Sequence, residues 1–143
     1  MAVLKTNVMR KQSGIEHGRV MPSYLGGRVR LIHAAAIPSE DLGKDSVVEI
    51  ARLPKGARLL PLSQVHLEGG KDFSCVIKVG DALSPGRYLA ETTVLGQNVS
   101  ICLDGGKFND FLPDRETAVF ATISDGSIAA GNRIVFDILY VVD

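Results

Sequence analysis

The sequence contains no tryptophan, and aromatic residues make up only 6% of its 143 residues. A glycosidase needs two carboxylates across a cleft, usually beside aromatic surfaces on which a sugar can stack. Asp110, Asp114 and Glu116 are close in the sequence, but their segment is rich in glycine and aspartate. We therefore interpret these three residues as part of a solvated loop and not as a catalytic pair.

Histidine is also scarce, with His17, His33 and His66 far apart in the chain. None of them has the spacing of a zinc site or a metalloprotease motif, so each is expected to be structural or exposed. No Gly-x-Ser-x-Gly sequence marks a nucleophile, and no glycine pair matches a phosphate-binding loop. The sequence therefore predicts no enzyme, no metal and no cofactor.

Only two cysteines are present, Cys75 and Cys102, and both lie within apolar runs. A cysteine in such a run behaves as a small hydrophobic residue, so we expect buried free thiols. A disulfide is the alternative if the two strands are adjacent. The first residues lack the apolar core of a signal peptide, and no apolar run approaches the length of a membrane helix. These features indicate synthesis in a reducing cytoplasm and no membrane partner.

The chain carries no net charge, with 16 basic and 16 acidic residues, which argues against a general nucleic-acid coat. The distribution is uneven. Residues 1–30 hold six basic residues and one acidic residue, a net charge of +5, so the rest of the chain carries −5. The basic segment has few aromatic residues for stacking on bases. We expect it to reach an acidic protein surface instead of nucleic acid.

Residues 1–26 show no clean hydrophobic period and are interpreted as an extended N-terminal arm with a short helical turn near residues 4–11. A disordered terminus is the alternative. The segment nevertheless includes the sizeable apolar residues Val3, Leu4, Val8, Met9, Ile15, Val20 and Met21, too many for a solvated tail. We therefore expect the arm to dock on a partner through its apolar and basic residues, which are Val3, Leu4, Lys5, Val8, Met9, Arg10, Lys11, Arg19, Val20 and Met21.

Residues 27–143 are predicted to form one β-sandwich domain, because short runs rich in β-branched residues alternate with turn residues. The runs at 72–80 and 133–142 alternate most clearly. The second is apolar on both faces, which favours a central strand or one covered by another subunit. The expected strands are 28–37, 46–53, 57–68 (one bent strand or two short ones), 72–80, 87–95, 98–103, 116–124 and 133–142.

Turn signals give a first idea of how these strands connect. Gly96-Gln97 fits a two-residue hairpin turn, which predicts that 87–95 pairs with 98–103. Asp125-Gly126 and Gly131-Asn132 are expected to bound a small turn region between the strands at 116–124 and 133–142. The longer connections at 38–45, 80–86 and 103–115 favour crossings between two sheets. Among sandwiches, barrels and jelly rolls, we favour an all-β, jelly-roll-like two-sheet sandwich of about eight strands.

One block of the chain, roughly residues 46–95, resembles the head decoration (cement) proteins of tailed bacteriophages. Its first part reads SVVEIARLPKGARLLPLSQVHLEG, and its second part reads CVIKVGDALSPGRYLAETTV. The features that carry the resemblance are a V-E-I-A-x-L-P strand, a following Gly-Ala, and a Gly-Asp that leads through a short turn to Arg-Tyr-Leu. In this chain these features are Val48 to Pro54, Gly56-Ala57, Gly80-Asp81 and Arg87-Tyr88-Leu89.

The resemblance implies a structural virion protein with a jelly-roll-like fold, made in the host cytoplasm. Such proteins sit on the outer surface of an icosahedral capsid as homo-dimers or homo-trimers and cement neighbouring major capsid protein subunits. The group has no catalytic residues to transfer, and the arm lies outside the resembling block. The alternatives are another phage structural component, such as a head–tail joining or tail protein, and a β domain that binds a sugar or another small ligand.

Overall fold

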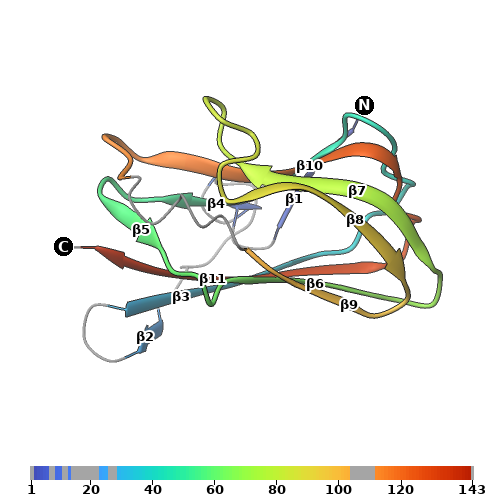
Figure 1. The fold of residues 1–143 in the computed structure, drawn as a ribbon, viewed down its shortest axis with the longest axis horizontal. Helices are drawn as coiled ribbons and strands as arrows, with labels where there is room; N and C mark the ends of the chain where they lie inside the picture. The colour runs from blue at the N-terminus through green and yellow to red at the C-terminus, as the bar shows by residue number, and fades with distance from the viewer. Residues whose placement is uncertain are drawn as a thin grey trace.

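A computed structural model describes residues 2–6, 9–10, 13, 23–25, 29–103 and 112–142. Within them the chain forms two β-sheets that pack face to face (Figure 1). The first sheet has the order β1 (Val3–Lys5), β4 (Val47–Leu53), β10 (Thr117–Ser127), β7 (Phe73–Gly80) and β8 (Leu89–Gly96). The second has the order β2 (Ser23–Leu25), β3 (Val29–Ala36), β11 (Arg133–Val142), β6 (Gln64–Glu68) and β9 (Val99–Cys102), and β5 (Ala57–Leu59) also pairs with β11. This confirms the jelly-roll-like all-β sandwich.

The core lies between the two sheets and is built from alternate residues of each strand. In β7 the residues Phe73, Cys75, Ile77 and Val79 are buried, while Ser74 is exposed. Side chains of successive strand residues point to opposite faces, so this alternation fills one face with apolar groups. The opposing sheet supplies the matching apolar row Ile134, Phe136, Ile138 and Tyr140 from β11, as the sequence pattern predicted.

Strand β11 is central, as its two apolar faces predicted. It pairs with β3 on one side and with β5 and β6 on the other. On its outer face Val135 is also buried, and Leu139 and Val141 are half-buried. The segment 57–68 forms two short strands, β5 and β6, and both pair with this one strand.

The predicted hairpin at Gly96-Gln97 is wrong. Strand β8 pairs with β7 in the first sheet, whereas β9 pairs with β6 in the second. The short turn after β8 therefore carries the chain from one sheet to the other. Both strands still face the same core, through Val94 in β8 and Ile101 in β9. The turn residues indicate only that the chain changes direction. Which strands then pair is decided by burial, because Val94 and Ile101 pack against the core from opposite sheets.

Two of the three predicted crossings are confirmed. The connection at 38–45 joins β3 to β4, and that at 103–115 joins β9 to β10, each between different sheets. The connection at 80–86 was wrongly assigned, because it joins the antiparallel neighbours β7 and β8 within the first sheet. The loop rises from the outer face of that sheet in Figure 1.

The first boundary of the turn region predicted between Asp125-Gly126 and Gly131-Asn132 is wrong, since β10 continues through Asp125 and Gly126 to Ser127. The turn itself lies at residues 130–131, before β11 begins at Arg133. The register with β7 shifts between Ile123 and Asp125. Gly126 has a φ of +73°, and a Cβ there would lie 2.3 Å from the carbonyl oxygen of Ser74. The glycine therefore marks an irregularity within a strand, where two backbones approach closely.

Candidate assembly surfaces

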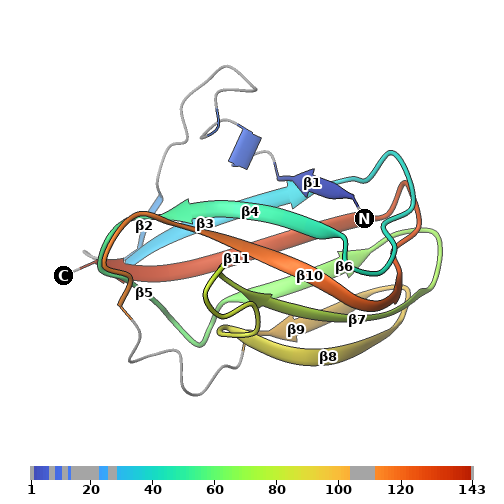
Figure 2. The same ribbon diagram turned by 90° about the horizontal axis from the view of Figure 1, so that it is seen from above.

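The N-terminal strand β1 forms one edge of the first sheet, beside β4 (Figure 2). The two strands are parallel, with Val3 opposite Val47 and Lys5 opposite Glu49. The Lys5 ammonium forms an ion pair with the Glu49 carboxylate. The first residues of the predicted arm thus pair with the body of the sandwich, and β2 likewise pairs with β3. The domain division at residue 26 stays a prediction.

A helical turn follows β1 and is capped by Thr6. The buried Thr6 hydroxyl donates to the carbonyl oxygen of Ile50 and accepts from the backbone N–H of Met9 at 3.1 Å. A threonine that accepts from the N–H three residues later is a typical N-cap. The backbone N–H of Arg10 then donates to the Thr6 carbonyl at 2.9 Å. Met9 is only 1% exposed, so this turn is held against the body.

The described residues of the predicted arm fall into two groups. Leu4 packs against the core and Met9 is buried, so both contact this chain itself. Val3 is 57% exposed and Arg10 is exposed, so a partner can reach both side chains. Half of the predicted partner-binding set lies outside the described residues, namely Val8, Lys11, Arg19, Val20 and Met21.

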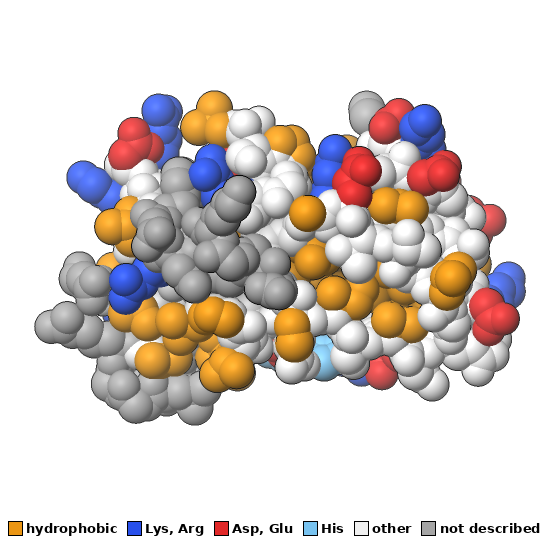
Figure 3. Space-filling view, in the orientation of Figure 1, with side chains coloured by type: hydrophobic (Ala, Val, Ile, Leu, Met, Phe, Trp, Pro, Cys, Tyr) orange, Lys and Arg blue, Asp and Glu red, His pale blue; other side chains and the backbone are white. Residues whose placement is uncertain are grey.

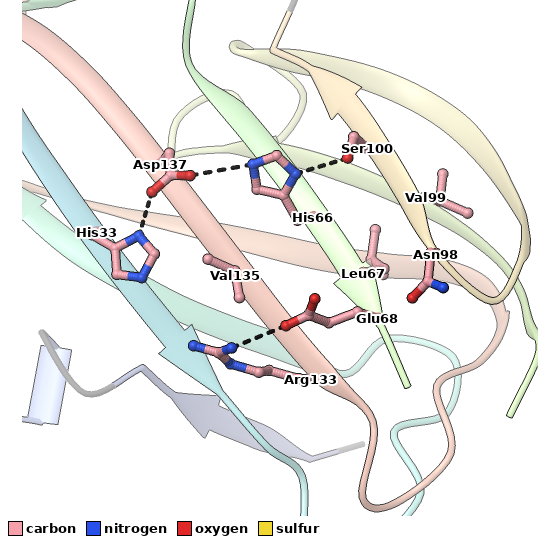
Figure 4. Close-up of a pocket in the computed structure, with 10 residues that line it drawn as sticks. All are labelled: His33, His66, Leu67, Glu68, Asn98, Val99, Ser100, Arg133, Val135 and Asp137. Carbon is pink, nitrogen blue, oxygen red and sulfur yellow. Dashed lines mark hydrogen bonds and ion pairs between the residues drawn. The ribbon is translucent and has the colours of Figure 1, made fainter. Parts of the chain in front are cut away.

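The outer face of the second sheet carries a polar network that spans four strands (Figure 4). Asp137 of β11 bonds His33 Nδ1 of β3 through Oδ1 at 2.5 Å and His66 Nε2 of β6 through Oδ2 at 3.2 Å. His66 Nδ1 lies 2.8 Å from Ser100 Oγ of β9. Nearby, Arg133 forms an ion pair with Glu68 at 3.0 Å.

Ser100, His66 and Asp137 follow one another in the order of a hydrolytic triad, but their setting differs from that of an active site. The cluster lies in a shallow depression of about 370 Å³ on the open sheet face. The carboxylate is shared with His33, which divides the orienting hydrogen bonds between two imidazoles. We interpret the network as cross-strand pairing that links the four strands. Within the described residues, no three His, Cys, Asp or Glu side chains are placed to hold a metal ion.

The sequence did not predict that the side chains of His33, His66 and Asp137 lie next to one another. It placed His33 and His66 in separate strands, and the structure shows His33 exposed and His66 half-buried. Each histidine alternates with inward apolar neighbours, which places it on the outer face. The missing information was the strand order β3-β11-β6, which sets both histidines beside Asp137.

The β7–β8 loop is a second organised surface feature, and Asp81 is its centre. The Asp81 carboxylate is 2% exposed and accepts from the backbone N–H groups of Leu83 and Ser84 at 3.0 and 2.9 Å. It also forms an ion pair with Arg87 Nε at 2.8 Å. Charge-assisted bonds of this kind fix a loop more firmly than neutral ones. The Gly-Asp and Arg-Tyr-Leu elements thus close the loop at both ends.

We call the contacts of Asp81 with Leu83, Ser84 and Arg87 the clasp of this loop. The residues on either side of the clasp, Gly80 and Tyr88, pack closely in the fold. A Cβ on Gly80 would lie 2.1 Å from the backbone oxygen of Ser84, so the loop folds back closely over the strand end. Tyr88 is buried, and its backbone N–H donates to the carbonyl oxygen of Val79 at 2.9 Å. Burial, with the nearby Asp81 charge, raises the pKa of Tyr88 to about 12, and Arg87 lowers it in part.

An apolar groove of about 360 Å³ lies beside this loop. Ala118 and Phe120 of β10 contribute its apolar strand side chains, Leu83 comes from the loop, and Pro113 from the segment before β10. Leu83 is 88% exposed. In Figure 3 hydrophobic side chains gather on the upper rim of the molecule, where the loop rises. The charged residues that border the groove are Asp81, Asp114, Arg115 and Glu116.

The two cysteines are both free, but they differ in environment. Cys75 is buried, as expected, whereas Cys102 is exposed, contrary to the prediction. Cys102 alternates with inward-facing Ile101 on the edge strand β9, so its side chain faces outward. Burial raises the pKa of the Cys75 thiol to about 11.

We expect iodoacetamide to modify the native protein once, at Cys102, and twice after unfolding. The thiolate is the reactive form, and Cys75 is both shielded and protonated at neutral pH. Intact-mass spectrometry with and without urea measures the number of adducts. Equal labelling rates of the two thiols in the native state would contradict the buried position of Cys75.

No helix among the described residues is long and apolar enough to cross a membrane. No protein-family model matches the sequence, and no curated protein matches it significantly. The structure is similar to a chain from the capsid of Ralstonia phage GP4, with a TM-score of 0.71, 18% identity and 99% of each chain covered. It is also similar to a chain of the cyanophage Pam1 capsid asymmetric unit, with a TM-score of 0.52, 16% identity, and 88% of this chain and 94% of that one covered. At this identity the similarity shows a shared fold.

Proposed function

We propose that this protein is a structural component of a phage virion that binds the outer surface of an icosahedral capsid and cements neighbouring major capsid protein subunits. The observation that carries the proposal is the similarity to a chain of the Ralstonia phage GP4 capsid over 99% of both chains. A match from end to end includes the N-terminal strand and the loops as well as the sandwich. It therefore supports a role in the same kind of assembly.

The elements in residues 46–95 that resemble decoration proteins have identifiable structural roles in the fold. The Gly-Asp and Arg-Tyr-Leu elements build the clasp of the β7–β8 loop. The first element forms β4, whose edge receives the N-terminal strand. These features are structural, which agrees with a protein that works by binding other proteins and not by catalysis.

The capsid contact is proposed to include the basic N-terminal segment. Met9 and Thr6 hold the start of this segment on the sandwich, while Val3 and Arg10 are exposed beside it. An anchored segment loses less conformational entropy on binding than a free tail does. With a net charge of +5 in residues 1–30, it would match an acidic shell surface.

Reversing three cations, with Arg10→Glu, Lys11→Glu and Arg19→Glu in one variant, is expected to weaken capsid binding by about tenfold or more. Wild-type binding should also weaken as salt rises, because screening shortens the reach of exposed charges. Binding is measured by co-sedimentation with capsids that lack this protein. A matched control, with Lys44→Glu, Lys55→Glu and Arg58→Glu, makes the same charge change at exposed positions of the body.

The location of the protein on virions tests the proposed function itself. We expect it to co-purify with capsids in a fixed ratio to the shell protein and to appear on the outer surface in a cryo-electron microscopy reconstruction. Density confined to the portal or the tail would instead support a head–tail joining or tail protein. Absence from purified particles would overturn the proposal.

A further inference from the structure

We propose that a basic groove between β1, the end of β3 and the start of β11 receives a short, extended acidic segment of the capsid shell protein. The groove lies beyond the end of β2, which pairs with β3 only from Val29 to Leu31 (Figure 2). Its volume of about 480 Å³ suits a few residues of chain and not a folded domain. The proposal rests on the proposed capsid binding and goes further, because it assigns one contact to a defined site and states the chemistry of the partner.

Among the described residues, every charged side chain that lines this groove is a cation. Lys5 comes from β1, Arg10 from the helical turn after it, and Arg133 from the start of β11. All three belong to ordered elements, and the turn that carries Arg10 is held to the body by buried Met9. Cations that are placed before binding lose little entropy when they meet an anion. The groove therefore favours a negatively charged partner.

Two of these cations already pair with carboxylates of their own sheets, but those carboxylates do not line the groove. Lys5 pairs with Glu49, and Arg133 Nη1 lies 3.0 Å from Glu68. An ammonium has three N–H donors and a guanidinium has five, so one such bond leaves donors for a second carboxylate. The two glutamates also reduce the attraction for an incoming anion, because their charges lie close to the cations. We therefore expect moderate effects of charge on binding.

Apolar and mostly small side chains make up the rest of the lining. They are Leu4, Ala35, Ala36 and Ile37. The alanines leave room for an extended backbone, and Ile37 is 60% exposed and directly follows β3. A nucleic-acid strand would gain from aromatic side chains on which bases stack, and the described lining residues include none. Apolar contacts beside cations instead suit an acidic peptide.

Two substitutions of Ile37 test the charge of the partner. Ile37→Asp adds a carboxylate to the groove and should weaken binding to capsids that lack this protein by about tenfold. Ile37→Lys removes the same apolar side chain but adds a cation, so its binding should stay within about threefold of the wild type. The matched control Leu62→Asp, at a leucine that is 71% exposed and does not line the groove, should leave binding unchanged. Co-sedimentation measures all four proteins, and equal losses for the two Ile37 variants, or none for Ile37→Asp, would overturn the proposal.

A photo-crosslinker at the same position identifies the segment that the groove holds. With p-benzoylphenylalanine in place of Ile37, irradiation of the capsid-bound protein should give an adduct with one shell-protein peptide that contains several Asp or Glu residues, as read by mass spectrometry. The same crosslinker in place of Leu62 should not capture that peptide. An adduct with nucleic acid, an adduct with a peptide that has no acidic residue, or no adduct despite normal capsid binding would overturn the groove's role and leave the proposed function standing. Wild-type protein that binds no capsids would overturn both.

Discussion

Replacing Phe136 with alanine is expected to lower the free energy of unfolding by about 3–5 kcal/mol. Phe136 is completely buried and lies in the middle of β11, the strand that pairs with β3, β5 and β6. Removing its ring deletes apolar contacts and leaves a cavity that the surrounding strands can only partly fill. Urea denaturation followed by circular dichroism measures the change.

Leu139→Ala on the same strand is the matched control. Leu139 is half-buried and points to the outer face of the second sheet. Its truncation should cost about 1 kcal/mol, because less apolar surface returns to water and no internal cavity forms. Equal losses for the two variants would contradict the assignment of the core to the inner face, because that assignment rests on the alternation along β11.

The alternation of apolar residues was enough to predict most strands and their buried faces. In β7 and β11 the period-two pattern follows directly from which side chains meet the core. Local pattern also identified β11 as central, because a strand with apolar residues on both faces needs cover on both sides. These features depend only on neighbouring residues, so the sequence alone could reveal them.

Strand pairing was harder to predict, as the turn at Gly96-Gln97 shows. A reversal of the chain is compatible with a hairpin in one sheet and with a passage between sheets. Strand β8 joins β7 because Val94 lies opposite Cys75 and fills the core from the first sheet. The choice therefore depends on residues more than fifteen positions away. The same applies to β1, whose partner β4 is over forty residues distant.

The surface features, too, could be predicted where they depend on neighbouring residues and could not where they depend on distant ones. The Gly-Asp and Arg-Tyr-Leu elements stood out in the sequence, but their role as a loop clasp depends on side-chain geometry. The groove joins the β7–β8 loop to residues 113–120, and the histidine network joins β3, β11, β6 and β9. Neither could be predicted without the strand order. The exposure of Leu83 has no local signal either, since its neighbours are ordinary turn residues.

Asp81→Ala is expected to destabilise the protein by about 2–4 kcal/mol. The substitution removes three hydrogen-bond acceptor contacts and leaves the Arg87 guanidinium without its carboxylate. The Arg87 side chain is 20% exposed, so water offsets part of the loss that a fully buried pair would show. Urea denaturation followed by circular dichroism measures the change.

The control for Asp81 is Glu116→Ala, which removes a carboxylate that is 64% exposed and lies 3.6 Å from Arg52. An exposed ion pair contributes little, so this variant should change stability by less than about 1 kcal/mol. If both variants lost the same small amount, the clasp would not be what holds the β7–β8 loop.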